Sequence, residues 1–580
     1  MAKKKPNRPR TAQAGQKPQA QPASAPLPLT PAAGVALPVS PTPWRKRLGQ
    51  AAAIGLPVLL FLILKGYSTA PFAGDENIYF YVGKRTAEGV VPYRELFLAH
   101  PPFHLLIAAL WMLPGYLGPW QLKLASVLPA AGALALLLVA ALRFRVGAIP
   151  ALIVGLALVG SQDFLSGSTH FTGANWSLLL VAAGLVAVAV ERRKTGGALL
   201  ASAALVSFHV IPAVAGIALG ELLASRKKAI PTILMLAGVT FGVHFLSLIV
   251  FGDPYYKQVF GYHMGKTPMA DAGEATVIRF FHYEYPLVLL AVGGTIAWLA
   301  ALWRARLGQG APPHRAYTLA VPAAVLQIAA VMSADRVFGY YNAPLLPLFA
   351  ILGFFFLDCG SRRLGDAVAA WRAGHPMRRR LIAIGVVAAL LAAGAAGGEA
   401  LERGLGYWNK EVGKTTAYEW RDSPALPSWL NVAVKAVFFR SDRKVGDVHL
   451  GITRYLWHEF VSENPIVLLP DFEAATDAPG TVFGDASTAP FFALATGRAI
   501  ALEMADTNVQ IFKSGLMTIP DLLSRLKAAP PTFIVGSPRR GLYTAPAFYE
   551  WVLADYREIA RREMAKGKWL ILYRRQAATP

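Results

Sequence analysis

Long apolar runs separated by short basic clusters fill the sequence from residue 48 to about residue 399. A helix needs about 20 apolar residues to cross a bilayer, and short loops rich in Lys and Arg stay in the cytoplasm. Of the 580 residues, 54% are hydrophobic and 16% are charged, whereas soluble domains carry about 25% charged residues. The pattern predicts a polytopic α-helical membrane protein.

The basic clusters also predict which ends of the runs face the cytoplasm. Residues 1–47 are rich in Pro, Ala and Lys and contain no acidic residue, so we expect a disordered basic cytoplasmic tail. Residues 48–399 are expected to form the membrane domain, with about eleven transmembrane helices. These are 51–67, 121–142, 147–163, 175–190, two short helices in 197–224 that return to the same side, 230–251, 286–303, 316–332, 343–357 and 381–397.

The first outer loop, residues 68–120, contains a shorter apolar run at 102–118. Pro114 and Gly115 interrupt this run, so we interpret it as a helix that lies at the outer interface of the membrane. The assignment keeps Arg143 and Arg145 on the cytoplasmic side after the next span.

The net charge of +23 does not indicate a nucleic-acid partner. Its Lys and Arg residues flank the apolar runs, where they act as topology signals. The single cysteine, Cys359, excludes a disulfide within the chain.

Residues 400–580 have the character of a soluble domain, which this topology places on the periplasmic or extracellular side. Short apolar runs alternate with helix-like segments, which predicts a C-terminal α/β domain with a partly parallel sheet. The expected strands are 465–470, 481–484, 499–504, 533–536 and 569–573, and the expected helices include 518–528 and 546–564.

Ionisable residues gather in the outer loops. Charge beside hydrocarbon is costly, so such residues tend to be functional, although position alone favours a solvated loop for those of the first loop. The third loop carries His263 and Lys266, but its Tyr runs favour an aromatic interface belt. The candidates from the other loops are Asp75, Glu76, His100, Asp163, His170, Arg336 and Tyr340.

A single outward-facing polar site built from these loops suits a phosphate-bearing, lipid-linked substrate. Arg336 offers positive charge for a leaving phosphate, unless it pairs with Asp335. A carboxylate base takes a proton from an acceptor hydroxyl. A divalent cation, Mg or Mn, is an optional cofactor, with Asp75 as its candidate metal ligand.

The first outer loop resembles that of the GT-C membrane glycosyltransferases. The residues that carry the resemblance are Gly74-Asp75-Glu76, Tyr79, Gly89, Pro92-Tyr93-Arg94 and Pro101-Pro102. Within that fold the chain looks closest to glycosyltransferase family 39, which holds protein O-mannosyltransferases and bacterial aminoarabinose transferases. The later string Arg336, Tyr340-Tyr341, Pro344 and Pro347 is similar to another outer loop of the family.

The resemblance implies an inverting transfer of a sugar from a polyprenyl-phosphate donor on the outer face of the plasma (inner) membrane. The acceptor is a lipid, a glycan or a protein. Asp75 matches the residue assigned as base or metal ligand, and Glu76 matches its acidic neighbour. His100 stands where aminoarabinose transferases carry a phosphate-binding Lys, and the resemblance gives Arg336 and Arg94 the same role. Tyr93, Tyr340, Asp163 and His170 are further candidates for contact with substrate or metal.

Two other classes of function remain open at the level of sequence. A transporter or flippase of lipid-linked substrates would carry ionisable residues in the middle of its spans, where His209 and His244 are the main candidates. An assembly protein would use the C-terminal domain as a binding module.

Overall fold

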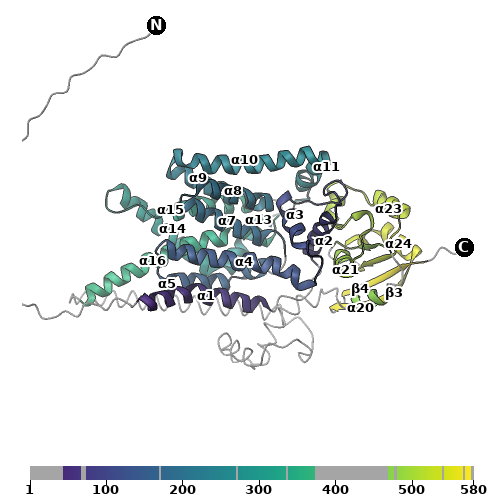
Figure 1. Ribbon diagram of the computed structural model, residues 1–580, viewed down its shortest axis with the longest axis horizontal. Coiled ribbons are helices and arrows are strands. Elements are labelled where there is room, and N and C mark those ends of the chain that lie inside the picture. The colour runs from purple at the N-terminus through teal and green to yellow at the C-terminus, as the bar shows by residue number, and fades with distance from the viewer. Residues whose placement is uncertain are drawn as a thin grey trace, which may run out of the picture. The chain divides into compact units, whose positions relative to one another are not determined.

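The computed structural model describes residues 43–66, 74–168, 171–268, 272–334, 337–372, 468–475, 480–486, 488–538, 541–565 and 568–576. The predicted disordered tail, apart from its last residues, and the predicted span 381–397 lie outside these residues. Figure 1 shows the described elements along the chain.

Apolar helices coincide with the predicted spans throughout the described residues. Six helices there are long and apolar enough to cross a membrane, which confirms a polytopic helical membrane protein, while the number of crossings stays a prediction. The helices at the predicted spans are α1 (Pro43–Gly66), α4 (Pro119–Arg143), α5 (Ala148–Val159), α7 (Ala174–Ala189), α8 (Arg193–Val206), α9 (Ile211–Ala224), α10 (Arg226–Phe251), α14 (Tyr285–Arg306), α15 (Arg315–Met332) and α16 (Leu345–Arg372).

Close helix packing builds the membrane domain. Helix α15 packs against α9 and α16, and α7 packs against α4 and α8. At the α9–α15 contact, a Cβ added to Gly216 would lie 2.3 Å from the Cα of Ala323. Glycine therefore allows these two backbones to touch, which is typical of helix pairs in membranes.

Helices α8 and α9 form the predicted pair of short helices that returns to its starting side. Arg193 at the start of α8 lies 3.0 Å from the carboxylate of Glu221 near the end of α9. Glu221 is fully buried and also pairs with Arg315 at the start of α15. Charged residues therefore join three helix ends at one end of the bundle.

The first outer loop contains two helices, α2 (Asp75–Ala87) and α3 (Pro102–Met112), which pack against each other. A Cβ on Gly83 of α2 would lie 2.6 Å from the carbonyl carbon of Ala108 in α3, so this contact is as close as that of α9 and α15. Helix α3 is shorter than the predicted run 102–118, because Gly115 adopts a φ of 85°, a left-handed conformation that ends a helix.

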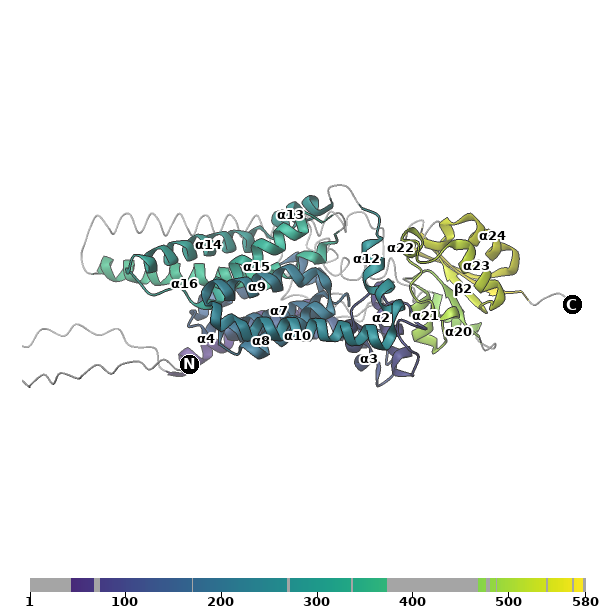
Figure 2. The same ribbon diagram turned by 90° about the horizontal axis from the view of Figure 1, so that it is seen from above.

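The C-terminal domain contains a four-stranded sheet in the order β1-β2-β4-β3. Strands β1 (Val482–Gly484) and β2 (Phe533–Gly536) are parallel, whereas β2, β4 (Lys568–Arg575) and β3 (Tyr556–Ala565) pair antiparallel. The prediction of an α/β domain with a partly parallel sheet is confirmed. Figure 2 shows the strand β2 and the helices grouped with it, which are α20 (Leu469–Ala474), α21 (Ala489–Thr496), α22 (Val509–Lys513), α23 (Ile519–Ala528) and α24 (Pro546–Asp555).

Three predicted elements of this domain were wrong. The helix 546–564 ends at Asp555, because residues 556–565 pair with β4 and this pairing outweighs their helix-like spacing. Residues 499–504 form no strand beyond one bridge from Ile500 to Val482, since Leu502 and Glu503 have φ values of 61° and 51°. The described part of 465–470 begins helix α20 instead of a strand.

Candidate active site

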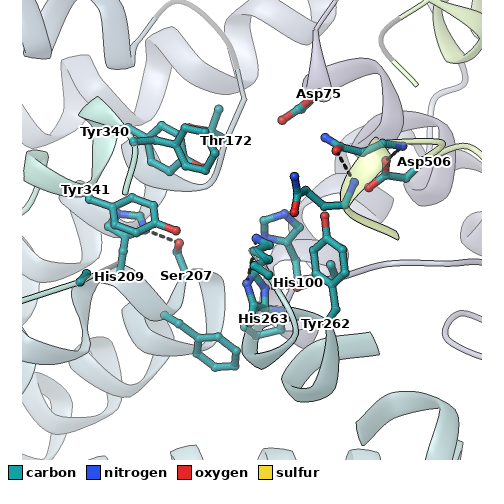
Figure 3. Close-up of a pocket in the computed structure, with 18 of the residues that line it drawn as sticks. Asp75, His100, Thr172, Ser207, His209, Tyr262, His263, Tyr340, Tyr341 and Asp506 are labelled. Atoms are coloured by element: carbon teal, nitrogen blue, oxygen red, sulfur yellow. Dashed lines mark hydrogen bonds between the residues drawn. The ribbon is translucent and has the colours of Figure 1, made fainter. Parts of the chain in front are cut away.

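A cavity of about 570 Å³ is lined by residues of the membrane domain and of the C-terminal domain. Its walls come from several parts of the chain that are far apart in sequence (Figure 3). They include Asp75 and Tyr79, His100, Thr172, Ser207 and His209, Tyr262 to Lys266, Tyr340 and Tyr341, and Asp506, Asn508 and Gln510.

Asp75 is the first residue of α2 and faces this cavity. Gly74 precedes it in an extended conformation, and a carboxylate in the first turn interacts favourably with the helix dipole. Burial among surrounding protein raises the pKa of Asp75, with a smaller contribution from Glu76, while the positive charge of Lys266 opposes the shift. A carboxylate with a raised pKa is a stronger proton acceptor.

His100 lines the same cavity and contacts Tyr79, which lies one turn after Asp75 in α2. The Tyr79 hydroxyl lies 2.8 Å from Nε2 of His100, and the His100 ring stacks on His104 with centroids 4.3 Å apart. Burial holds the pKa of His100 well below its ordinary value. His100 is therefore neutral near pH 7 and offers a substrate a hydrogen bond and not a positive charge.

Lys266 supplies positive charge to the cavity, which the interpretation of its loop as an aromatic belt missed. Its ammonium lies 3.1 Å from Nδ1 of His263 and 4.6 Å from the centre of the Tyr262 ring. His263 donates from Nε2 to the carbonyl oxygen of Ala99, at 2.7 Å. Burial and Lys266 lower the pKa of His263 to about 4, so this imidazole is neutral and its Nδ1 accepts a hydrogen bond from Lys266.

Glu76 faces away from the cavity although it follows Asp75 directly. It forms an ion pair with Lys123 of α4, and both side chains are 2% exposed. Its second oxygen accepts a hydrogen bond from the backbone N–H of Phe171, at 3.2 Å. Through these contacts Glu76 connects the start of α2 to α4 and to the segment before α7, as a positioning residue would.

The other predicted site residues differ in their position relative to the cavity. Tyr340 lines the cavity. Tyr93 is fully buried with a φ of 62° and donates from its hydroxyl to the carbonyl oxygen of His100, at 2.9 Å, so it supports the wall from behind. Arg94 donates to the carbonyl oxygen of Val250, at 2.6 Å, and is not among the lining residues. His170 and Arg336 lie outside the described residues.

Asp163 also lies away from the cavity lining. Its backbone N–H donates to Glu284, at 2.8 Å, and this contact joins α6 (Gln162–Gly167) to the residue that precedes α14.

The C-terminal domain contributes a second carboxylate, Asp506, which sequence reasoning missed. Oδ1 of Asp506 accepts a hydrogen bond from the backbone N–H of Asn508, at 2.9 Å. Burial raises the pKa of Asp506 to about 7, and the negative charge of Asp75 adds to the shift. Titratable groups with shifted pKa values that share a cavity are typical of active sites.

Several polar atoms of the cavity wall have no hydrogen-bond partner among the described residues. They are Oγ1 of Thr172, Nε2 of His209 and Oε1 of Gln510. A buried polar atom without a partner costs about 1–3 kcal/mol. Such atoms around one cavity indicate that a polar ligand completes the site.

A divalent cation finds limited support in these residues. Within the part of the chain that the structure describes, no group of three or more His, Cys, Asp or Glu side chains is placed to hold a metal ion. Asp75 and Asp506 offer oxygen ligands, but Lys266 adds a positive charge beside them. The cation at Asp75 stays a prediction.

A bundle of apolar helices with a polar cavity beside a C-terminal α/β domain defines the class as a multi-pass membrane protein with the GT-C fold. One protein that shares this fold is ArnT from Cupriavidus metallidurans. Its crystal structure with undecaprenyl phosphate matches with a TM-score of 0.57 and 16% identity, over 92% of this chain and 98% of ArnT. Its apo structure gives a TM-score of 0.54 and 17% identity, over 90% and 98%. No protein-family model matches the chain, and no curated protein matches it by sequence.

Proposed function

We propose that the protein is a membrane glycosyltransferase that moves a sugar from a polyprenyl-phosphate donor to a lipid, glycan or protein acceptor. The observation that carries the proposal is the cavity at the membrane edge, in which the Asp75 carboxylate and the Lys266 ammonium interact. The shared fold with ArnT, which was crystallised with undecaprenyl phosphate, supports a lipid phosphate as the leaving group.

The proposed reaction assigns a role to each charge. The Lys266 ammonium attracts the donor phosphate, because a cation in a cavity partly shielded from water interacts strongly with an anion. An acceptor hydroxyl attacks the anomeric carbon, and Asp75 accepts its proton. The new bond joins the anomeric carbon to the acceptor oxygen, while the bond from that carbon to the phosphate oxygen breaks. The polyprenyl phosphate leaves with the electron pair, and attack opposite to it inverts the anomeric centre.

The same proposal places the protein in the plasma (inner) membrane with its N-terminus in the cytoplasm and the cavity on the outer face. A transporter is less well supported by the described helices, because their buried charges lie near helix ends and are hydrogen-bonded or paired. Lys65 donates to Leu165, Lys123 pairs with Glu76, and Glu221 pairs with Arg193. A substrate pathway through the bundle would place such groups in the middle of the spans.

Replacement of Asp75 tests the proposal. Purified protein in lipid nanodiscs is incubated with undecaprenyl phosphates that each carry one radiolabelled sugar, and sugar transfer or release is measured for wild type and Asp75→Asn. Asp253→Asn is the matched control, because Asp253 is an exposed aspartate that forms a surface pair with Lys257. We expect wild type and Asp253→Asn to turn over the donor at similar rates, and Asp75→Asn to lose at least about 100-fold in turnover. Full activity of Asp75→Asn would refute the role of this carboxylate.

A further inference from the structure

The segment Asp506–Gln510 of the C-terminal domain presents alternate side chains to the cavity. Asp506, Asn508 and Gln510 line it. Thr507 instead donates from its hydroxyl to the carbonyl oxygen of Gly484, at 2.9 Å, and Val509 is 44% exposed. Asp506 and Thr507 precede α22, Asn508 caps that helix and Gln510 lies in its first turn, so this short stretch forms one polar edge of the cavity.

Gln510 is the most informative residue of this edge. It is only 6% exposed, and its carboxamide oxygen has no hydrogen-bond partner among the described residues. Buried polar groups in proteins are almost always hydrogen-bonded. An unpartnered amide oxygen in a cavity wall is therefore a reason to expect a ligand with a hydrogen-bond donor.

The polar edge is attached to the helix that begins with Asp75. Glu503, three residues before Asp506, lies 2.7 Å from Nη2 of Arg85 and accepts a hydrogen bond from the Tyr81 hydroxyl, at 2.8 Å. Tyr81 also accepts from the backbone N–H of Ile500, at 2.7 Å. Arg85 and Tyr81 belong to α2, so the helix that begins with Asp75 also fixes the position of the polar edge.

We propose that Asp506 and Gln510 form the subsite that binds hydroxyl groups of the sugar being transferred and so direct its anomeric carbon towards Asp75. The inference rests on the glycosyltransferase function proposed above. A carboxylate repels a phosphate but accepts hydrogen bonds from hydroxyl groups, and a carboxamide both donates and accepts. The donor phosphate is thereby directed to Lys266, and the sugar to the C-terminal domain.

Competition binding to the full-length protein in nanodiscs tests this subsite without an acceptor. Radiolabelled undecaprenyl phosphate is displaced by unlabelled undecaprenyl phosphate, or by undecaprenyl phosphates that carry a hexose, a pentose or an N-acetylhexosamine. The variants are Asp506→Asn and Gln510→Leu. Val509→Ala is the matched control, since Val509 belongs to the same segment but is not among the residues that line the cavity.

We expect wild type to bind at least one sugar-bearing lipid more tightly than undecaprenyl phosphate. Both variants should lose about tenfold in affinity for that lipid, the effect of one lost hydrogen-bonding group, and keep their affinity for undecaprenyl phosphate within about twofold. Asp506→Asn preserves the shape of the side chain and decides the question if Gln510→Leu does not fold. Equal losses for both kinds of lipid, or no loss for either, would overturn the subsite. Wild type that binds no undecaprenyl phosphate would instead overturn the proposed function itself.

Discussion

The buried ion pair between Glu76 and Lys123 allows a sharp test of whether Glu76 is a catalytic or a positioning residue. Both side chains are 2% exposed. Glu76→Gln leaves the ammonium of Lys123 without its counter-charge in a site closed to water. Removal of one partner of such a pair destabilises a protein by about 3–5 kcal/mol, whereas replacing both partners with residues of similar volume is often neutral.

The double variant Glu76→Gln/Lys123→Met therefore provides the decisive comparison. We expect Glu76→Gln to lower the free energy of unfolding by about 3–5 kcal/mol, and the added Lys123→Met to restore most of it. Glu88→Gln is the matched control, because Glu88 follows the same helix and its pairs with Lys84 and Arg85 are partly exposed. Such surface pairs contribute about 0–1 kcal/mol.

Unfolding by SDS titration in mixed micelles, followed by circular dichroism, gives these free energies, and the donor assay gives the turnover of each variant. A positioning role predicts that stability and turnover fall together in Glu76→Gln and recover together in the double variant. Turnover that stays low in a double variant of restored stability would refute this reasoning and make Glu76 catalytic.

Three further predictions follow from the charges of the site. The kcat/KM of transfer should fall with decreasing pH as Asp75 becomes protonated. The inflection of the pH–rate profile should lie above the ordinary pKa of aspartate, because the pKa of Asp75 is raised, and Lys266→Met should move it to still higher pH. Asp506→Asn should raise the free energy of unfolding by up to about 4 kcal/mol at pH 8 and by little at pH 4. A folded-state pKa of about 7 means that the folded protein favours the protonated acid, so ionisation of Asp506 destabilises the fold increasingly as the pH rises from about 4 to 7. The asparagine removes this destabilisation. Equal effects at both pH values would contradict it. Glu503→Gln should weaken the contact with Arg85 by about 1–3 kcal/mol, visible as faster amide hydrogen exchange at residues 500–510, and unchanged exchange would contradict it.

The sequence predicted the membrane domain well because the signals for it are local. Apolar length and flanking charge act on each segment separately, and the two short helices predicted within 197–224 are present as α8 and α9. Lys123 carried a signal that our interpretation did not use. A lysine inside an apolar run needs a partner, and Glu76 is that partner.

The composition of the cavity was less accessible to sequence reasoning. Asp75 was found because it stands in a recognisable string, whereas Asp506 lies between a short helical turn and α22 with no motif around it. Its contact with the cavity depends on the packing of Tyr81 and Arg85 against Glu503, which joins distant parts of the chain. The strand β3 was missed for a related reason, because pairing with β4 and not local propensity fixes it.

The charges of the described cavity residues suit a reaction in which charge moves from a sugar bond to a phosphate. Burial keeps His100 and His263 neutral, so Lys266 is the residue that faces the donor phosphate in the proposed reaction, while Asp75 and Asp506 are the acidic groups of the described lining. In the proposed transfer the phosphate gains one negative charge when the sugar leaves, and Asp75 loses one when it accepts the proton of the acceptor. The net charge of the cavity is then the same before and after the transfer. In a site partly shielded from water this balance avoids the cost of a new unpaired charge, and a carboxylate with a raised pKa near a lysine in one cavity suits such a transfer.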